Sequence, residues 1–245
     1  MEVPSFIRVK FKERLKTISK ELSDLENFLR ENGVNVPEEN ITLRPYEKIW
    51  IPSGYIRTVS YYTEKYKLYK LIEDEIIVKN IAYSLQTSDF FNYILNRFRI
   101  ELSVKKVFYK YAIINIFSII EAILYGIVKK CHSFCIDKNG KVCKKSTRCQ
   151  FYLKKPNKYS FRNLLEVLSS KNLLKMPPRI QDKVLKMKEL RDNIHLWDVK
   201  YKEYFNKEYE LKNYNFLVKC LQVLKEDLND SLPKFEEKRK KFCKK

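Results

Sequence analysis

The segment KMKELRDNIHLW, residues 186–197, holds the side chains of this chain that are best suited to chemistry. Arg191 and His195 are four positions apart, so on a helix they are neighbours on one face and can converge on one ligand atom. Histidine titrates near neutral pH, as a general acid or base must, and the planar guanidinium of arginine suits a phosphate. The pair therefore predicts phosphodiester chemistry, in which arginine offsets developing charge and histidine moves a proton.

Helical periodicity places this pair on the apolar face of its own helix. At about 100° per residue, four apolar residues fall within an arc of about 80°: Ile180, Val184, Met187 and Ile194. Arg191 and His195 lie inside or beside that arc, which directs them toward a partner helix or a second subunit. A structural interpretation stays open, in which Arg191 pairs with Glu121 and His195 bonds to a backbone carbonyl.

Glu121 is the other unusual polar residue, because it lies near the centre of the most apolar segment, residues 111–128. That segment is about the minimum length for a transmembrane helix. A carboxylate in lipid is expensive, so we expect a core helix, with membrane attachment as the less favoured alternative. Ser118, Glu121 and Tyr125 share an arc of about 60°, and such a polar stripe needs a polar partner in the fold.

Three runs of the sequence carry a family resemblance. They are IFSIIEAIL at 116–124, SFRNLLEVLSS at 160–170 and KMKELRDNIHL at 186–196. In this order they are similar to the HEPN superfamily of all-helical nucleotide-binding and ribonuclease domains, over roughly residues 89–232. The mark of that family is an arginine, a polar residue and a downstream histidine, which in this chain are Arg191, Asp192 and His195.

The resemblance implies a helical bundle and a homodimer that brings two Arg-His pairs into one cleft. Active members cleave RNA without a metal, through attack of the ribose 2′-hydroxyl on the adjacent phosphate. By this likeness His195 is the acid or base, Arg191 binds the phosphate and Asp192 orients one of them, while Glu121 matches a polar position on the neighbouring core helix. The function expected is therefore a metal-independent endoribonuclease, as in a defence or toxin system.

The spacing of the motif keeps a second function open. This chain leaves three residues between Arg191 and His195, fewer than the commoner family pattern. Many family members are inactive, so the alternative is a catalytically inactive RNA-binding or scaffold subunit. A protein or RNA regulator is a further expected partner.

Residues 131–157 form a predicted basic, cysteine-bearing insertion. Its four cysteines would suit a tetrahedral structural zinc that folds the loop: Cys131, Cys135, Cys143 and Cys149. The paired C-x2-C spacing of zinc knuckles is absent, so free thiols and disulfides stay open. Basic and aromatic side chains there suit a phosphate backbone with stacked bases: Lys141, Lys144, Lys145, Arg148, Tyr152, Lys154 and Lys155. A solvated loop is the alternative.

Composition sets the class of fold and of partner. Hydrophobic residues make up 44% of the 245, which excludes a wholly disordered chain, and 4 Gly and 8 Pro provide few turns for a many-stranded fold. Fifty Lys and Arg against 30 Asp and Glu give a net charge of +20, which favours nucleic acid or an anionic membrane as partner. Compositional bias is the alternative explanation. No secretory leader pattern is seen, so we expect a cytoplasmic protein with reduced cysteines.

The elements that must position these residues are all helices. We expect an all-α, HEPN-like bundle over residues 61–245, preceded by an arm, residues 1–60, that holds one helix and an irregular connector. Within the bundle, helical periods and cap residues predict helices over 61–84, from Ser88 or Asp89 toward Leu102, after Ser160, after the prolines at 177 and 178, and over 209–232.

Overall fold

The computed structural model describes residues 5–32, 56–100, 102–136, 149–192 and 209–243. The chain divides into two units, residues 1–51 and 52–245, whereas the sequence pattern suggested a boundary after residue 60. The regular segments in the described residues are helices, and no β-strand occurs among them. The mostly helical, all-α class is therefore confirmed.

The described part of the first unit is a single helix, α1, Ser5–Glu31. It was expected from apolar residues spaced by three and four positions. Its C-terminal end is closed by Asn32, whose backbone N–H and side-chain amide both donate to the carbonyl of Phe28, at 3.1 and 2.7 Å. Those bonds satisfy a carbonyl that the end of a helix otherwise leaves without a partner.

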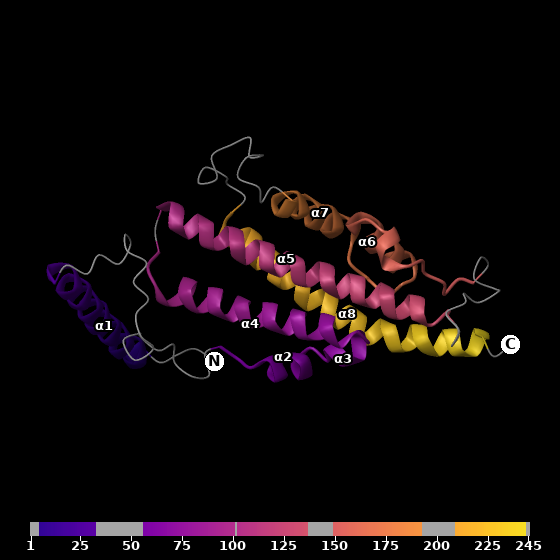
Figure 1. Ribbon diagram of the computed structural model, residues 1–245, viewed down its shortest axis with the longest axis horizontal. Coiled ribbons are helices and arrows are strands. Elements are labelled where there is room, and N and C mark those ends of the chain that lie inside the picture. Colours follow the sequence, from indigo (N-terminus) through magenta and orange to yellow (C-terminus); the bar gives the residue numbers. More distant parts are fainter. Residues whose placement is uncertain (1–4, 33–55, 101, 137–148, 193–208, 244–245) are drawn as a thin grey trace. The chain divides into compact units, whose positions relative to one another are not determined.

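The second unit is a bundle built around one long central helix, α5, Leu102–Ser133 (Figure 1). The longer helices that pack on it are α4, Glu75–Arg97, α6, Phe161–Ser170, α7, Pro178–Asp192, and α8, Leu211–Cys243. Since α5 touches each of them, it is the element on which the rest of the bundle is assembled.

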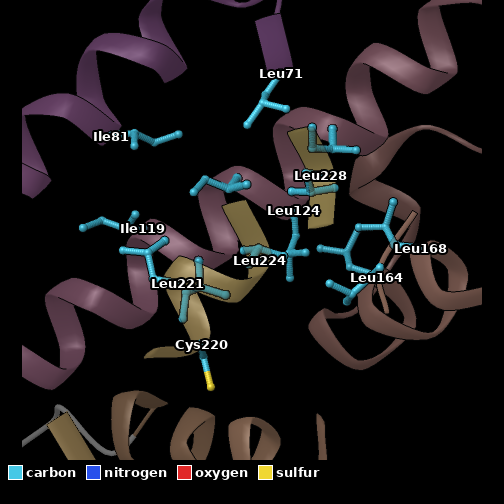
Figure 2. Packing of buried hydrophobic residues seen from close by; sticks show 14 of the residues in the cluster. Leu71, Ile81, Ile119, Leu124, Leu164, Leu168, Cys220, Leu221, Leu224 and Leu228 are labelled. Carbon is cyan, nitrogen blue, oxygen red and sulfur yellow. The ribbon is translucent and has the colours of Figure 1, made fainter. Parts of the chain in front are cut away.

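The apolar segment predicted to be a core helix is the buried centre of the bundle. Figure 2 shows Leu124 of α5 with leucines of α6 and α8 around it. Phe117, Leu124 and Ile127 of α5 have no exposed surface. By length and composition alone α5 could cross a membrane, but in this structure most of its apolar stretch is covered by the other helices. Burial of such side chains is the main force that stabilises the bundle.

The region before α5 differs from the sequence prediction. In place of one helix over 61–84, two short helices form, α2, Val59–Lys65, and α3, Leu68–Leu71, separated by Lys67 with a positive φ of 51°. The long helix α4 starts after Asp74, whose carboxylate accepts from the N–H groups of its first turn. Asp74 is therefore the N-cap of α4.

The prediction that a new helix starts at Ser88 or Asp89 was wrong, because both lie buried in the middle of α4. Their side chains therefore do not cap a helix end, and each has a hydrogen-bond partner on another segment. Asn115 on α5 donates to Ser88 Oγ at 2.8 Å, and Arg57 holds the carboxylate of Asp89. Tertiary contacts thus override the local capping preference of serine and aspartate.

The final helix, α8, is longer than predicted. The amphipathic pattern indicated a helix over 209–232, which ends just before Pro233. The helix instead continues through Pro233. Phe235, beyond the proline, is buried, and its ring centroid lies 5.2 Å from that of Phe151. Two further contacts lie beyond the proline, from Glu236 Oε1 to Lys130 Nζ at 2.9 Å and from the Arg239 guanidinium to the carbonyl of Phe134.

Candidate functional site

The helix that carries the motif, α7, packs as its period predicted. Val184 is fully buried and Met187 is 5% exposed, while Ile180 is half-buried against the core. The helix continues through Asp192, so the backbone of position 191 is helical. The side chains of Arg191 and Asp192, and the whole of His195, lie outside the described residues.

Glu121 lies on the central helix, next to the element that bears the motif. It is half-buried and has an interaction partner, and α5 and α7 are in contact. Ser118, on the same stripe, donates from Oγ to the carbonyl of Ile114 at 2.9 Å, and Tyr125 is also half-buried. The stripe therefore lies at the edge of the core, and the two helices that carry Glu121 and Arg191 are neighbours.

A hollow of about 530 Å³ lies between the start of α6 and the middle of α7. It is lined by Ser160, Phe161, Arg162, Asp182, Leu185, Lys186 and Lys188. Ser160 is the N-cap predicted for α6, since its hydroxyl accepts from the Asn163 N–H at 3.2 Å. Three cations against one carboxylate make this hollow basic, and Lys188 is one helical turn before position 191. We call this space the α6–α7 hollow.

The described cysteines of the predicted insertion are buried. Cys131 and His132 belong to the last turn of α5. Cys131, Cys135 and Cys149 are all buried free thiols. Among the described residues, no three His, Cys, Asp or Glu side chains are placed to hold a metal ion. Burial raises the pKa of Cys131 to about 12, so its thiol stays protonated at neutral pH. Cys143 lies outside the described residues.

His132, the residue after Cys131, is buried in the last turn of α5. Its Nδ1 lies 2.7 Å from the carbonyl oxygen of Leu153, which ties the end of α5 to the segment before α6. Its Nε2 is buried with no hydrogen-bond partner among the described residues. Its ring centroid lies 6.1 Å from that of Tyr152, so the two rings pack together.

The predicted RNA-binding residues are only partly described. Tyr152 is half-buried against the core, whereas Lys154 and Lys155 are exposed. Four others fall outside the described residues: Lys141, Lys144, Lys145 and Arg148. The backbone N–H of Lys154 donates to the hydroxyl of Tyr159 at 3.0 Å, which fixes the chain at the exposed lysines.

A second concave surface, which sequence reasoning missed, lies between the α6–α7 connection and α8. It has a volume of about 410 Å³ and is lined by Gln150, Phe151, Ser170, Lys171, Asn172, Lys175, Asp230, Ser231, Lys234, Phe235 and Lys238. We call it the basic groove. Its four lysines come from segments about sixty positions apart, so no run in the sequence marks them.

Ion pairs organise the lysines of the basic groove. Asp230 lies 3.0 Å from Lys175 Nζ and 2.7 Å from Lys234 Nζ, and hydrogen bonds from Lys234 and then Lys175 lower the pKa of its carboxyl. Lys171 donates to the carbonyl of Gln150. Four cations around a single carboxylate leave the groove with a positive charge at neutral pH.

Backbone geometry holds the two sides of the groove together. Asn172 has a φ of 55°, and its N–H donates to Ser169 while that of Leu173 donates to Leu168, both at 2.9 Å. This is the Schellman end of a helix, with asparagine at the left-handed position. Ser231 on α8 donates to the carbonyl of Leu173 at 2.6 Å, so the connection is fastened to α8. The groove is therefore a preformed feature of the bundle.

Comparison of the chain with family models, curated proteins and solved structures found no match. The HEPN resemblance therefore rests on the sequence motif, and the groove and the hollow supply the structural observations that bear on function.

Proposed function

We propose that this protein binds RNA, and that the basic groove receives the phosphate backbone. The observation that carries this proposal is the groove itself, a concave surface of about 410 Å³ with lysines on both sides. Contacts to phosphates from lysine and arginine supply most of the affinity in sequence-independent nucleic-acid binding. A preformed groove places such cations without the entropy cost of ordering a loop.

The distribution of charge supports the bundle as the unit that binds. Residues 1–51 contain nine Lys and Arg and nine Asp and Glu, so the whole excess of +20 falls in residues 52–245. A surface with this excess attracts a polyanion over a distance set by the salt concentration. Binding and its salt dependence are therefore expected to belong to the bundle.

A second proposal concerns cleavage. The α6–α7 hollow, with Arg162, Lys186 and Lys188, opens one turn before position 191, where a bound phosphate would be near the motif. By the HEPN resemblance, His195 moves the proton and Arg191 binds the phosphate during attack of the ribose 2′-hydroxyl. The activity proposed is a metal-independent endoribonuclease that acts as a homodimer, in which two motifs share one cleft.

Binding is tested by a salt titration with a labelled single-stranded RNA. The Lys171→Ala, Lys238→Ala double variant should weaken binding and reduce the slope of log K against log salt by about 1.4, because each lost phosphate contact contributes about 0.7. The matched control removes two exposed lysines elsewhere in the bundle, Lys105→Ala and Lys219→Ala. Equal losses of affinity and slope in both double variants would contradict a role for the groove.

Cleavage is tested by incubating the protein and its His195→Ala variant with a mixed RNA pool in excess EDTA. The expected products of the unaltered protein end in 2′,3′-cyclic phosphate, and the variant should lose cleavage while keeping its affinity for RNA. Clear, salt-sensitive binding without any cleavage would reject the ribonuclease proposal and leave RNA binding as the function.

A further inference from the structure

The helix α1 presents an apolar seam with the period of a coiled coil. Phe11, Leu15, Ile18, Leu22 and Leu25 are spaced alternately by four and three positions within one continuous helix. An average spacing of 3.5 residues is the mark of a helix that pairs with another helix along its length. We call these five residues the α1 seam.

From Leu15 to Leu25 the seam is partly exposed. Ile18 is 50% exposed and Leu25 is 44% exposed, and Leu15 and Leu22 are half-buried. Other apolar side chains of α1 are also exposed: Phe6, Ile7, Val9 and Phe28. So much exposed apolar surface on one helix marks an interaction site.

Charge along α1 selects the kind of partner. Among its described side chains, the first half, up to Ile18, carries Lys10, Lys12, Arg14 and Lys16 against a single acidic residue, Glu13. The second half carries Glu21, Asp24 and Glu31 against a single cation, Lys20. An antiparallel pair of α1 helices sets each basic half beside an acidic half, whereas a parallel pair sets like charges together.

We propose that α1 pairs with the α1 of a second copy of this chain, in an antiparallel two-helix coiled coil. In the register centred on residue 20, Leu15 of one copy lies level with Leu25 of the other, and Ile18 lies level with Leu22. The proposal does not depend on RNA binding or cleavage.

The test is sedimentation equilibrium of the full-length protein from about 1 to about 200 µM, since mass action makes a dimer concentration-dependent. The unaltered protein should form a dimer, and the Leu15→Glu, Leu22→Glu variant should stay monomeric. The matched control adds the same two charges away from the seam, as Thr17→Glu and Ser23→Glu, and should still dimerise. Helix content from circular dichroism verifies that each variant keeps its fold.

Salt dependence of the dimer tests the orientation without any substitution. Opposite charges attract in the antiparallel pair, so salt should weaken the dimer, whereas a parallel pair, which brings like charges together, should strengthen with salt. A stronger dimer at high salt would overturn the antiparallel arrangement. A monomer at every concentration would overturn the proposal, because α1 would then not pair with a second copy. A dimer that persists in the Leu15→Glu, Leu22→Glu variant would also overturn it, because the dimer contact would then lie in the bundle.

Discussion

At the scale of single residues, Asp89 shows how an aspartate in mid-helix is accommodated. It is 5% exposed, and its carboxylate accepts three hydrogen bonds from Arg57. Arg57 Nε donates to Oδ2 at 2.7 Å, the Arg57 backbone N–H donates to Oδ2 at 3.1 Å, and Nη2 donates to Oδ1. Gln86 holds the same arginine, since its amide donates to the Arg57 carbonyl at 3.0 Å. The segment before α2 is thereby fastened to α4.

The environment of Asp89 also changes its titration. Burial acts to raise the pKa of the carboxyl, but the hydrogen bonds from Arg57 outweigh it and lower the pKa below 3.8. A lowered pKa in the folded state means that the ionised form favours folding. The stabilisation is therefore present above about pH 4 and is lost as the pH falls through the folded-state pKa.

We predict that Asp89→Asn lowers the free energy of unfolding by about 2 kcal/mol at pH 7, because Arg57 loses its charged partner. Urea denaturation at pH 7, 5 and 3 measures it, and the difference between variant and unaltered protein should shrink at pH 3. Asp230→Asn, an exposed carboxylate with lysine partners, is the control and should change stability less. A difference that stays constant over this pH range would contradict the prediction.

At the scale of elements, Gly126 sets how closely α3 and its following residue approach α5. A Cβ atom at this position would lie 2.9 Å from Ile72 Cγ1, and Ile72 is 1% exposed. In an isolated helix, alanine is more favourable than glycine by about 1 kcal/mol. At position 126 the close approach of Ile72 leaves too little room for a Cβ atom. Packing between the two elements therefore favours glycine over alanine here.

We predict that Gly126→Ala destabilises the bundle by about 1–2 kcal/mol, because overpacking costs more than the gain in helix propensity. Combining it with Ile72→Ala removes the clash, so the double variant should be less destabilised than the sum of the single ones. The measurement is a double-mutant cycle by chemical denaturation, with Ile72→Ala alone as reference. Additive effects would show that the two positions do not interact.

At the scale of the whole molecule, the bundle contains its own core. Among the described residues, every buried member of the hydrophobic cluster lies between Tyr62 and Phe235. The two units also differ in charge, since the first is balanced and the second carries the whole +20. The bundle should therefore fold and bind RNA without residues 1–51.

We predict that residues 52–245 alone unfold in one cooperative transition, with a Tm within about 3 °C of that of the full chain, because the described core residues all belong to this part of the chain. The same fragment should keep the salt-dependent RNA affinity of the full chain. Thermal unfolding followed by circular dichroism, with an RNA titration of the same sample, measures both. A fragment without a cooperative transition would show that the first unit belongs to the core.

The candidate site could be only partly predicted from the sequence. The stripe of Val184 and Met187 on α7 was predicted correctly, because the helical period is a property of neighbouring residues. Asp192 ends the described part of that helix, so the roles of Arg191 and His195 stay predictions. The basic groove was missed because its lysines meet only after the α6–α7 connection is fastened to α8.

The sequence by itself determined the helical class, α1, the apolar core helix and the cap at Ser160, since each depends on local spacing or on one side chain beside a helix end. Only the tertiary structure decided that α8 continues through Pro233 and that Asp89 is an ion-pair partner. It also created the groove, where Lys175 bonds to residues 52 and 55 positions away. The physical reason is that packing between distant segments, once formed, outweighs the weak local preferences of single residues.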